Sequence, residues 1–503
     1  MQKQANTSLG IAYFYCDYKD LKTHDPFIIL GALVRQLAIQ NPRCLGTLDK
    51  FYALHYRESR STTGPSVTPE DLCSLIQSLS TFFDEVMVII DALDECGTDR
   101  SKVVELLASL NTDGFNIKTL FTSRLETDIE FHLDSYEKIS IAATSSDLRL
   151  YVASEIESRS RKKLLRTRDP DLKGEIMDRL VEGAEGMFRW VACQMDYLCE
   201  LNTDKAIRKA LNSLPPTLSA TYERILDKVN ASNADTQRLV QNVLTWMICS
   251  KEPLSTKELL EAVSISEGDT ELDSDAMPDE EGILKWCSSL VRKTPNGERL
   301  ELAHFTVEEF LLEIDANELN NPYARYKITP EDQDLALAKL CMTYLLFDDF
   351  QDLNCTGIEA LEDIRNGVEH GFYRYCAVYW AGHALAYRHD EGLLDLVKVL
   401  FDPSKTGNFL SWSNFWSWNT ADDVDLELIS NTETLHFAAA LSFYDICEWL
   451  IKENGRIADL DKLSSIGTPL YCALTAEDLF VPPPDVEMNY SGKSQLLGGQ
   501  SHL

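Results

Sequence analysis

The sequence predicts an α/β unit built on a parallel sheet, followed by a longer part that is mainly helical. Two observations lead to this fold class. In the first part, short apolar runs that suit strands alternate with segments of helical period, which is typical of parallel sheets. From Ser145 onward the apolar residues recur with helical spacing almost throughout. The 503 residues are enough for about three or four domains.

The first part begins with an aromatic-rich strand at residues 11–16 (IAYFYC). Asp25 and Pro26 follow as a helix N-cap and a proline in the first helical turn. Helices are expected at 27–40, 70–83 and 101–110, and further short strands at 118–124 (KTLFTSR) and 138–141 (KISI).

The central element of this part is residues 86–96, VMVIIDALDEC. Its leading residues are apolar at every position, as in a strand buried on both faces. Asp91 follows at the carboxyl end, where open α/β sheets bind their ligands, and Asp94 and Glu95 come soon after. In nucleotide-hydrolysing proteins a carboxylate at this place holds Mg²⁺, and a following acid positions the attacking water. The plainer interpretation is a buried strand that leads into an acidic turn.

The middle of the chain predicts a helical domain followed by a winged helix. Pro215 and Pro216 separate the two as a hinge or boundary. The winged helix is expected from three helices followed by two β-like segments, 291–294 and 299–303, around a Pro-Asn-Gly turn. The acidic insert 266–282 has few apolar residues and should form a mobile loop. Helices are expected at 147–159, 175–182, 187–201, 203–214, 217–229, 239–249, 255–263 and 283–291.

The last part predicts further helices and a degenerate internal repeat. Residues 433–439 (ETLHFAA) and 468–474 (TPLYCAL) lie 35 positions apart, and both approximate the ankyrin opening TPLHxAA. Residues 402–423, with three tryptophans, are expected to be irregular. Helices are expected at 332–347, 357–366, 373–388 and 391–401.

These patterns predict six consecutive segments. They are an α/β domain at 1–144, a helical domain at 145–215, a winged helix at 216–315, a helical linker region at 316–430, ankyrin-like repeats at 431–480 and a tail at 481–503.

The composition limits the partners and the compartment. A net charge of −34 repels nucleic-acid phosphates and anionic lipids, so we expect neither nucleic acid nor membrane as a partner. The 13 cysteines include no CxxC pair and suit a reducing compartment. No apolar run approaches about 18 residues and no signal peptide is visible, so we expect a soluble protein of the cytoplasm or nucleus and assign it as cytoplasmic.

Several motifs together resemble the NACHT-ankyrin proteins of filamentous fungi, which belong to the STAND class of signalling NTPases and are similar to NLR proteins. The resemblance covers about residues 9–315 well and becomes thin beyond them. The matching stretches are YFYCDYKD, DPFIILGALVRQLA, VIIDALDEC, LFTSR, GMFRWVACQ, LPPTLSATYERIL and AHFTVEEFL.

This resemblance implies roles for particular residues. Asp91 resembles the Mg²⁺ ligand, and Asp94 and Glu95 resemble the acids that position water. Arg124 resembles the arginine that senses the γ-phosphate, although it could simply cap a strand end and pair with Glu126 or Asp128. His304 stands where related proteins use a histidine to hold the β-phosphate of ADP, although a single histidine at a helix entry is more often structural.

The departure from the family is the absence of its Gly-rich phosphate loop, GxxxxGK[ST] (Walker A). In the family this loop precedes the YFYC-like strand by about 30 residues, and only ten residues precede that strand here. The one GK[ST] triplet, Gly492-Lys493-Ser494, has Glu487 in place of the first glycine. We therefore expect an N-terminally truncated domain with vestigial site residues. No cofactor is expected unless the loop is supplied, in which case Mg²⁺ with ATP or ADP would bind.

The predicted function is that of a degenerate STAND/NACHT signalling or scaffold protein. It would act through protein partners bound by the ankyrin-like and helical regions, without NTPase activity of its own. The alternative is a working ATP- or GTP-dependent switch of the NLR type, if a phosphate loop lies upstream. A third interpretation, a DNA-binding winged helix, is opposed by the net charge.

Overall fold

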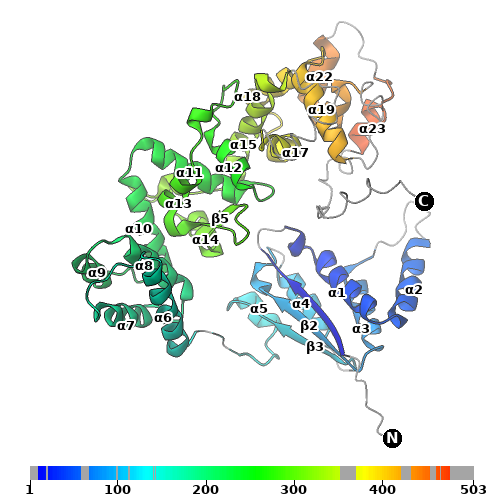
Figure 1. Cartoon of the computed structure of the whole chain (residues 1–503). Coiled ribbons are helices and arrows are strands. Elements are labelled where there is room, and N and C mark those ends of the chain that lie inside the picture. Colours follow the sequence, from blue (N-terminus) through cyan, green and yellow to red (C-terminus); the bar gives the residue numbers. More distant parts are fainter. Residues whose placement is uncertain are drawn as a thin grey trace, which may run out of the picture. The chain divides into compact units, whose positions relative to one another are not determined.

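The computed structural model of the chain divides into two compact units, Met1–Ile141 and Ala142–Leu503, which are described separately (Figure 1). The structure describes all residues except 1–8, 18–20, 58–66, 98–99, 112–113, 140, 142, 352–369, 421–431, 454–459, 465 and 476–503.

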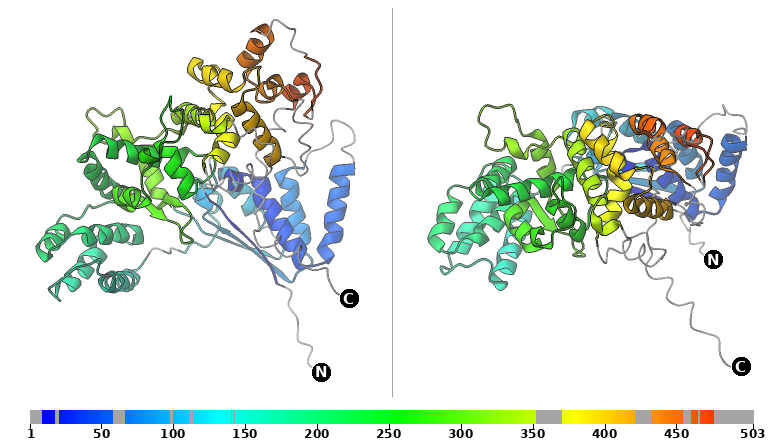
Figure 2. Two further views of the ribbon diagram at one scale, coloured as in Figure 1. Left: turned by 45° about the horizontal axis from the view of Figure 1, so that its top comes forward. Right: turned by 90° about the horizontal axis from the view of Figure 1, so that it is seen from above.

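The first unit contains a three-stranded parallel sheet in the order β1 (Leu9–Tyr15), β2 (Glu85–Asp91) and β3 (Ile117–Phe121). The register pairs Tyr15 with Asp91 and Ile90 with Phe121, so the three carboxyl ends meet at one edge (Figure 2). The parallel sheet was predicted. The expected strand at 138–141 is wrong for its described residues, since Ile139 and Ile141 are exposed coil.

The connecting helices are α1 (Pro26–Gln40), α2 (Arg43–Arg57), α3 (Pro69–Ser80), α4 (Arg100–Ser109) and α5 (Thr127–His132), with short 3₁₀ turns at η1 (Leu21–His24) and η2 (Leu93–Glu95). Three of them, α1, α3 and α4, lie where helices were predicted, whereas α2 and α5 were not predicted. Asp25 caps α1 as predicted, because its carboxylate accepts the Phe27 N–H at 2.8 Å.

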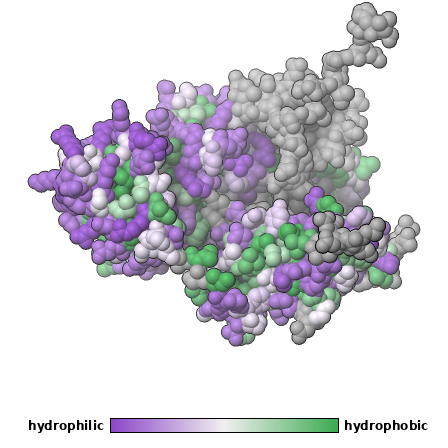
Figure 3. Space-filling view, turned by 60° about the horizontal axis from the view of Figure 1, so that its bottom comes forward, coloured by the Kyte–Doolittle hydropathy of each residue, from purple (hydrophilic) through white to green (hydrophobic). Residues whose placement is uncertain are grey.

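Among the described residues of the first unit, helices cover one face of the sheet. Ala12, Val88 and Ile90 share a core with the buried side chains of α1, α3 and α4. The opposite face stays open, with Tyr13 50% and Leu120 52% exposed. The reason is topological: both crossovers, β1 to β2 and β2 to β3, advance in the same direction, and right-handed connections then place all helices on one side. Figure 3 shows hydrophobic side chains gathered on one face of this unit, in the lower part of the view.

The two edges of the sheet differ. Along β1, the side-chain amides of Gln36 and Gln40 on α1 bond the backbone N–H and C=O groups of Tyr13 and Ile11, at 2.6–3.0 Å. These glutamines therefore take the place of a further strand. Within the described residues, β3 has no strand on its outer side.

The second unit begins with a helical group that has its own core around Trp190. It consists of α6 (Ser145–Arg161), α7 (Leu172–Gly183), α8 (Phe188–Glu200) and α9 (Asp204–Leu211). Thr144 begins α6 with a capping box to Asp147, close to the predicted change of period at Ser145.

Helices and a hairpin follow, as expected for a winged helix. The hairpin pairs β4 (Val291–Lys293) with β5 (Leu300–Leu302), and Gly297 supplies the left-handed turn residue at φ +78°. Part of the acidic insert is fixed to the structure, because the Asp348 N–H donates to the Thr270 carbonyl at 2.8 Å. The helices are α10 (Leu218–Asn230), α11 (Ala234–Cys249), α12 (Thr256–Ser264), α13 (Glu280–Cys287) and α14 (Phe305–Glu313), with turns η3 (Ser274–Ala276) and η4 (Ser288–Leu290).

The final helices share one hydrophobic core with the winged-helix segment. The expected irregular stretch at 402–423 is wrong, because α19 (Gly407–Thr420) lies there and buries Trp412 against Phe437. The helix expected at 357–366 lies outside the described residues. The remaining elements are η5 (Ala324–Tyr326), α15 (Pro330–Leu345), η6 (Asp348–Phe350), α17 (Tyr373–Ala384), α18 (Glu391–Leu400), α21 (Thr434–Ala440), α22 (Tyr444–Glu453) and α23 (Pro469–Leu474).

Candidate functional site

The candidate site lies at the carboxyl edge of the sheet in the first unit. Asp91 ends β2, and its carboxylate accepts a hydrogen bond from the Thr122 hydroxyl, directly after β3. Thr122 also fixes the turn that follows Asp91, since its hydroxyl accepts the Ala92 N–H at 2.9 Å and its carbonyl accepts the Leu93 N–H at 2.9 Å. Ala92 needs this support because it adopts a left-handed conformation, φ 54°.

Arg124 forms an ion pair with the carboxylate of Asp94. The guanidinium Nε donates to one carboxylate oxygen at 2.7 Å, and the backbone N–H of Arg124 donates to the other at 3.1 Å. The Asp94 side chain is only 6% exposed, so the pair is sheltered on its acidic side. The two predicted site residues are thus brought together, but as partners of each other.

The suggested pairing of Arg124 with Glu126 or Asp128 is not what the structure contains. Arg100 on α4 takes both carboxylates, at 3.4 Å to Glu126 and 2.8 Å to Asp128. The hydrogen bond to Asp128 raises the pKa of Arg100, and the guanidinium lowers the pKa of Asp128. Neither Arg100 nor Thr122 was singled out from the sequence, although Thr122 lies inside the LFTSR motif.

Glu95 lies half-buried in the short turn η2, directly before Cys96. Its backbone N–H closes the turn on the Ala92 carbonyl at 2.8 Å. The structure therefore gathers Asp91, Asp94, Glu95 and Arg124 at one edge of the sheet, as the strand order predicts.

The described residues do not by themselves make a magnesium site. Mg²⁺ takes about six oxygen ligands in octahedral geometry. Asp91 and Thr122 could supply two oxygens, whereas Asp94 is committed to Arg124. No group of three or more metal-ligating side chains occurs among the residues that the structure describes. The remaining ligands would have to come from a bound nucleotide and water.

His304 belongs to the second unit and acts there as a helix cap. Its Nδ1 accepts the Thr306 N–H at 3.3 Å, and the ring lies against Phe305 at the start of α14. The Thr306 hydroxyl in turn contacts the Tyr222 hydroxyl at 2.8 Å. These contacts give the histidine a structural role in the winged helix. Any ligand would have to use its other nitrogen, Nε2.

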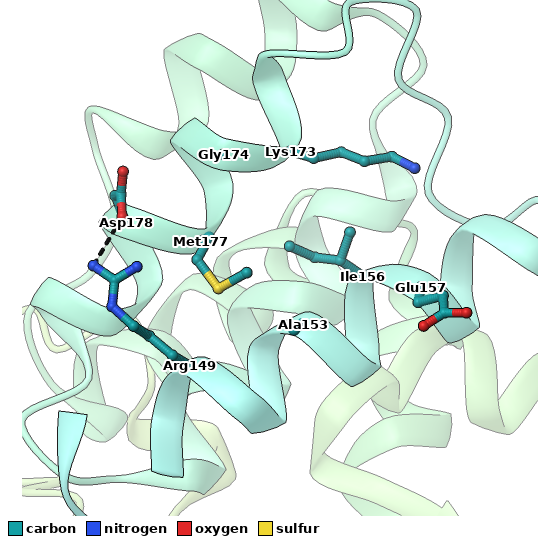
Figure 4. A pocket seen from close by; sticks show the side chains of 8 residues that line it. All are labelled: Arg149, Ala153, Ile156, Glu157, Lys173, Gly174, Met177 and Asp178. Carbon is teal, nitrogen blue, oxygen red and sulfur yellow. Dashed lines mark ion pairs between the residues drawn. The ribbon is translucent and has the colours of Figure 1, made fainter. Parts of the chain in front are cut away.

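A groove lies between α6 and α7 of the second unit, and none of the predicted site residues lines it (Figure 4). It has a volume of about 530 Å³ and an adjoining hollow of about 740 Å³. The Arg149–Asp178 ion pair, 3.0 Å long and exposed on both sides, stands at its margin. Ala153, Ile156 and Met177 give it an apolar floor.

Comparison with known proteins finds one family match in each unit. Residues 1–124 match the family described as nephrocystin 3, N-terminal, and residues 226–324 match the winged helix domain of GPI inositol-deacylase. The chain is 24% identical over 462 residues to vegetative incompatibility protein HET-E-1 of Podospora anserina, which covers 86% of this chain and 31% of that protein. These matches support a NACHT-class protein. The winged-helix prediction is confirmed.

A second relative covers less of this chain. It is the azaphilone pigments biosynthesis cluster protein L of Monascus ruber, 27% identical over 215 residues, which is 40% of this chain and 42% of that protein. The chain thus spans about a third of HET-E-1 and less than half of the pigment-cluster protein. Among the described residues, none of the helices is both long and apolar enough to cross a membrane.

Proposed function

We propose that this NACHT-class chain is a signalling or scaffold protein that works through protein contacts and has no NTPase activity of its own. One observation carries the proposal. The Asp94 carboxylate at the sheet edge is bound by Arg124, and the given sequence contains no phosphate-loop motif beyond the degenerate triplet at 492–494. Acids without a phosphate cradle have no nucleotide oxygens with which to complete a magnesium shell.

The C-terminal end is the proposed recognition module. We interpret α21 and α23 as the first helices of two ankyrin-like units. His436 is fully buried and accepts the Glu433 N–H at 3.1 Å. It also contacts the Lys462 carbonyl at 2.9 Å, and this contact joins the first ankyrin-like repeat to the segment that leads into the second. The equivalent positions Leu435 and Leu470 differ, at 7% and 67% exposed. The second ankyrin-like repeat therefore presents an apolar side to solvent. Repeats of this type are stabilised only by packing against neighbouring repeats.

The likeness to a vegetative incompatibility protein supports a role in non-self recognition as part of the same proposal. A cytoplasmic location belongs to it as well, and all cysteines that the structure describes are free thiols, which suits a reducing compartment. Cell fractionation would measure the location directly.

The enzymatic part is tested by phosphate release from ATP and GTP in the presence of Mg²⁺. We expect the full chain and its Asp91→Asn variant to release phosphate at the same background rate. A rate that falls with Asp91→Asn would overturn this part of the proposal. The partner part is tested by affinity capture with the full chain and with a chain ending at residue 431. Loss of the captured partners on truncation is expected, and their retention would move the recognition surface to the helical region.

The alternative function is an active ATP- or GTP-dependent switch of the NLR type. A specific observation favours it: Asp91 is held by Thr122 at the carboxyl edge beside β3, whose outer side has no strand within the described residues. A further parallel strand carrying GxxxxGK[ST] would place phosphates at this edge. Reading the frame upstream for that motif decides between the two functions.

A further inference from the structure

A run of basic residues ends helix α6 in the second unit and forms the turn after it. Residues 161–168 (RKKLLRTR) contain five cations and no acid, in a chain whose net charge is −34. We call this segment the basic turn, and its cations, all of them exposed, are Arg161, Lys162, Lys163, Arg166 and Arg168. A cluster of one charge sign on a chain of the opposite sign creates a local field that attracts anionic groups.

The backbone of the basic turn is fixed by hydrogen bonds and by burial. The N–H groups of Leu164 and Leu165 both donate to the Arg159 carbonyl near the end of α6, at 2.9 and 3.2 Å. Leu165 is 4% exposed and belongs to the core of the helical group. Beyond it, the N–H of Arg168 donates to the Asp204 carboxylate at 3.1 Å. Because the frame is already ordered, a partner that binds the cations loses less conformational entropy.

Four of the five cations lack an ion pair within the residues that the structure describes. The exception is Arg161, which lies 3.8 Å from Glu157, and both of these side chains are exposed. The next acid in the sequence, Asp169, is bound by Arg208 at 2.6 Å. The basic turn therefore presents positive charge that its neighbours do not neutralise.

A role in stabilising α6 explains only part of this charge. Cations at the carboxyl end of a helix offset its dipole, which accounts for Arg161 and Lys162. The effect falls off within the last turn of the helix, so it does not account for Arg166 and Arg168. An apolar side chain also stands among the cations, since Leu164 is 51% exposed. An apolar centre with a charged rim is typical of protein interfaces.

We propose that the basic turn is a docking site for an acidic peptide segment of a protein partner. The carboxylates of the partner lie against the exposed cations, and an apolar side chain of the partner packs on Leu164. This surface belongs to the helical group rather than to the ankyrin-like end. The inference therefore stands apart from the recognition module proposed above.

Partners that carry phosphates fit this surface less well than an acidic peptide. A nucleic acid or a membrane extends beyond the basic turn and would meet the surface of a chain with a net charge of −34. Single-stranded nucleic acids also stack their bases on aromatic rings, and residues 161–168 contain none. A short acidic peptide needs only the basic turn itself.

The test measures binding of a fluorescent acidic peptide to the full chain by fluorescence anisotropy. The probe has the sequence of this chain's own acidic insert, residues 266–282, which contains eight acids, no base and one leucine, Leu272. We expect saturable binding that weakens about tenfold when the salt is raised from about 50 to about 200 mM. The same peptide with amides in place of its carboxylates should not bind.

Two triple variants that lose the same charge separate the basic turn from the general field of the chain. The site variant should weaken binding about tenfold and combines Lys162→Gln, Arg166→Gln and Arg168→Gln. Lys163 is kept because its backbone is left-handed, with φ 59°. The control variant should bind as wild type does and replaces three exposed cations of the first unit, as Arg43→Gln, Lys50→Gln and Lys102→Gln.

A single variant tests the apolar part of the surface. Leu164→Asn changes no charge and should weaken binding about threefold, because the apolar side chain of the peptide loses its contact. Circular dichroism of every variant verifies that the helices are kept. The salt dependence and the amide peptide use the wild type and stand without any variant.

Four results would overturn the proposal. The first is the absence of binding to the wild type at low salt. The second is equal weakening by the site and control variants, which would assign binding to the general field. The third is binding of single-stranded RNA or of anionic vesicles to the basic turn as tight as that of the peptide. The fourth is self-association in sedimentation that the site variant abolishes, which would make a second copy the occupant.

Discussion

Glu261 is a carboxylate that joins the winged helix to the following helices, and its removal should weaken that junction. Glu261 lies on α12 and is 1% exposed. Its two oxygens accept the backbone N–H groups of Gly371 and Phe372, each at 3.0 Å, and the Tyr344 hydroxyl at 2.6 Å. Burial and the neighbouring carboxylate raise the pKa of Tyr344, so this hydroxyl remains a donor. The carboxylate thus caps α17 from a different element.

The magnitude follows from the groups left behind. In Glu261→Ala, three buried donors lose their acceptor, and each unsatisfied group costs about 1–3 kcal/mol. Removing the charge also relieves its own desolvation, so we expect a net loss of about 2–4 kcal/mol in the free energy of local opening. Glu261→Gln keeps the shape and one oxygen and loses one acceptor position, which should cost about 1–2 kcal/mol.

Hydrogen exchange measured by mass spectrometry suits a protein of several units, because it reports local opening. In Glu261→Ala the peptide that spans Gly371 to Ala384 should exchange roughly 30-fold to 700-fold faster than in wild type. Glu261→Gln should lie between the two. The exposed Glu313→Ala should leave the peptide unchanged, and peptides of the first unit serve as an internal reference. Equal exchange in Glu261→Ala and Glu313→Ala would refute the reasoning.

Three further predictions concern the edge, the repeats and the pH response. Replacing Gln36 and Gln40 by Leu should open the backbone edge of β1 and increase aggregation measured by light scattering, and a double variant as monomeric as wild type would contradict this. Leu435→Asp should unfold the C-terminal end at a cost of several kcal/mol, whereas Leu470→Asp, at the exposed equivalent position, should leave its proteolysis pattern unchanged. Burial lowers the pKa of His383 below its usual 6.5, so the native state binds fewer protons than the unfolded one. Thermal stability should fall as the pH drops below about 6.5, and His383→Gln should flatten that fall.

The last of these depends on what surrounds His383. Its Nδ1 contacts Asp334 at 2.6 Å and its Nε2 contacts the Tyr375 hydroxyl at 2.8 Å, while Lys251 bonds Asp334 at 2.9 Å. Burial opposes ionisation of Asp334, but the hydrogen bonds from His383 and Lys251 outweigh it and lower the pKa of Asp334. The two groups therefore act in the same direction, and acid weakens this junction between α11, α15 and α17.

The sequence predicts the parallel strands well because their hydrophobicity is continuous. Residues 86–90 are apolar throughout and form β2 between β1 and β3. The expected burial on both faces is wrong, because Met87 and Ile89 are only partly buried. Capping residues were equally readable: Asp25 with Pro26 marks the start of α1. The winged-helix hairpin followed from a Pro-Asn-Gly turn between two short β-like segments.

What the sequence could not predict depends on distant contacts. Residues 402–423 carry three tryptophans and polar residues without a clear period, yet α19 forms because Trp412 is buried against Phe401 and Phe437. The pairing of Arg124 with Asp94 rather than with Glu126 or Asp128 arises because Arg100, on another helix, already holds those two carboxylates.

The central claim is that the acids at the sheet edge do not make a nucleotide site by themselves, and calorimetric titration tests it most directly. ATP or ADP with Mg²⁺ would be titrated into the full chain and, in parallel, into Asp91→Ala. The account predicts no heat of binding tighter than about millimolar for either protein. Micromolar binding to the wild type that is weakened in Asp91→Ala would contradict it, and would identify the chain as a working nucleotide switch.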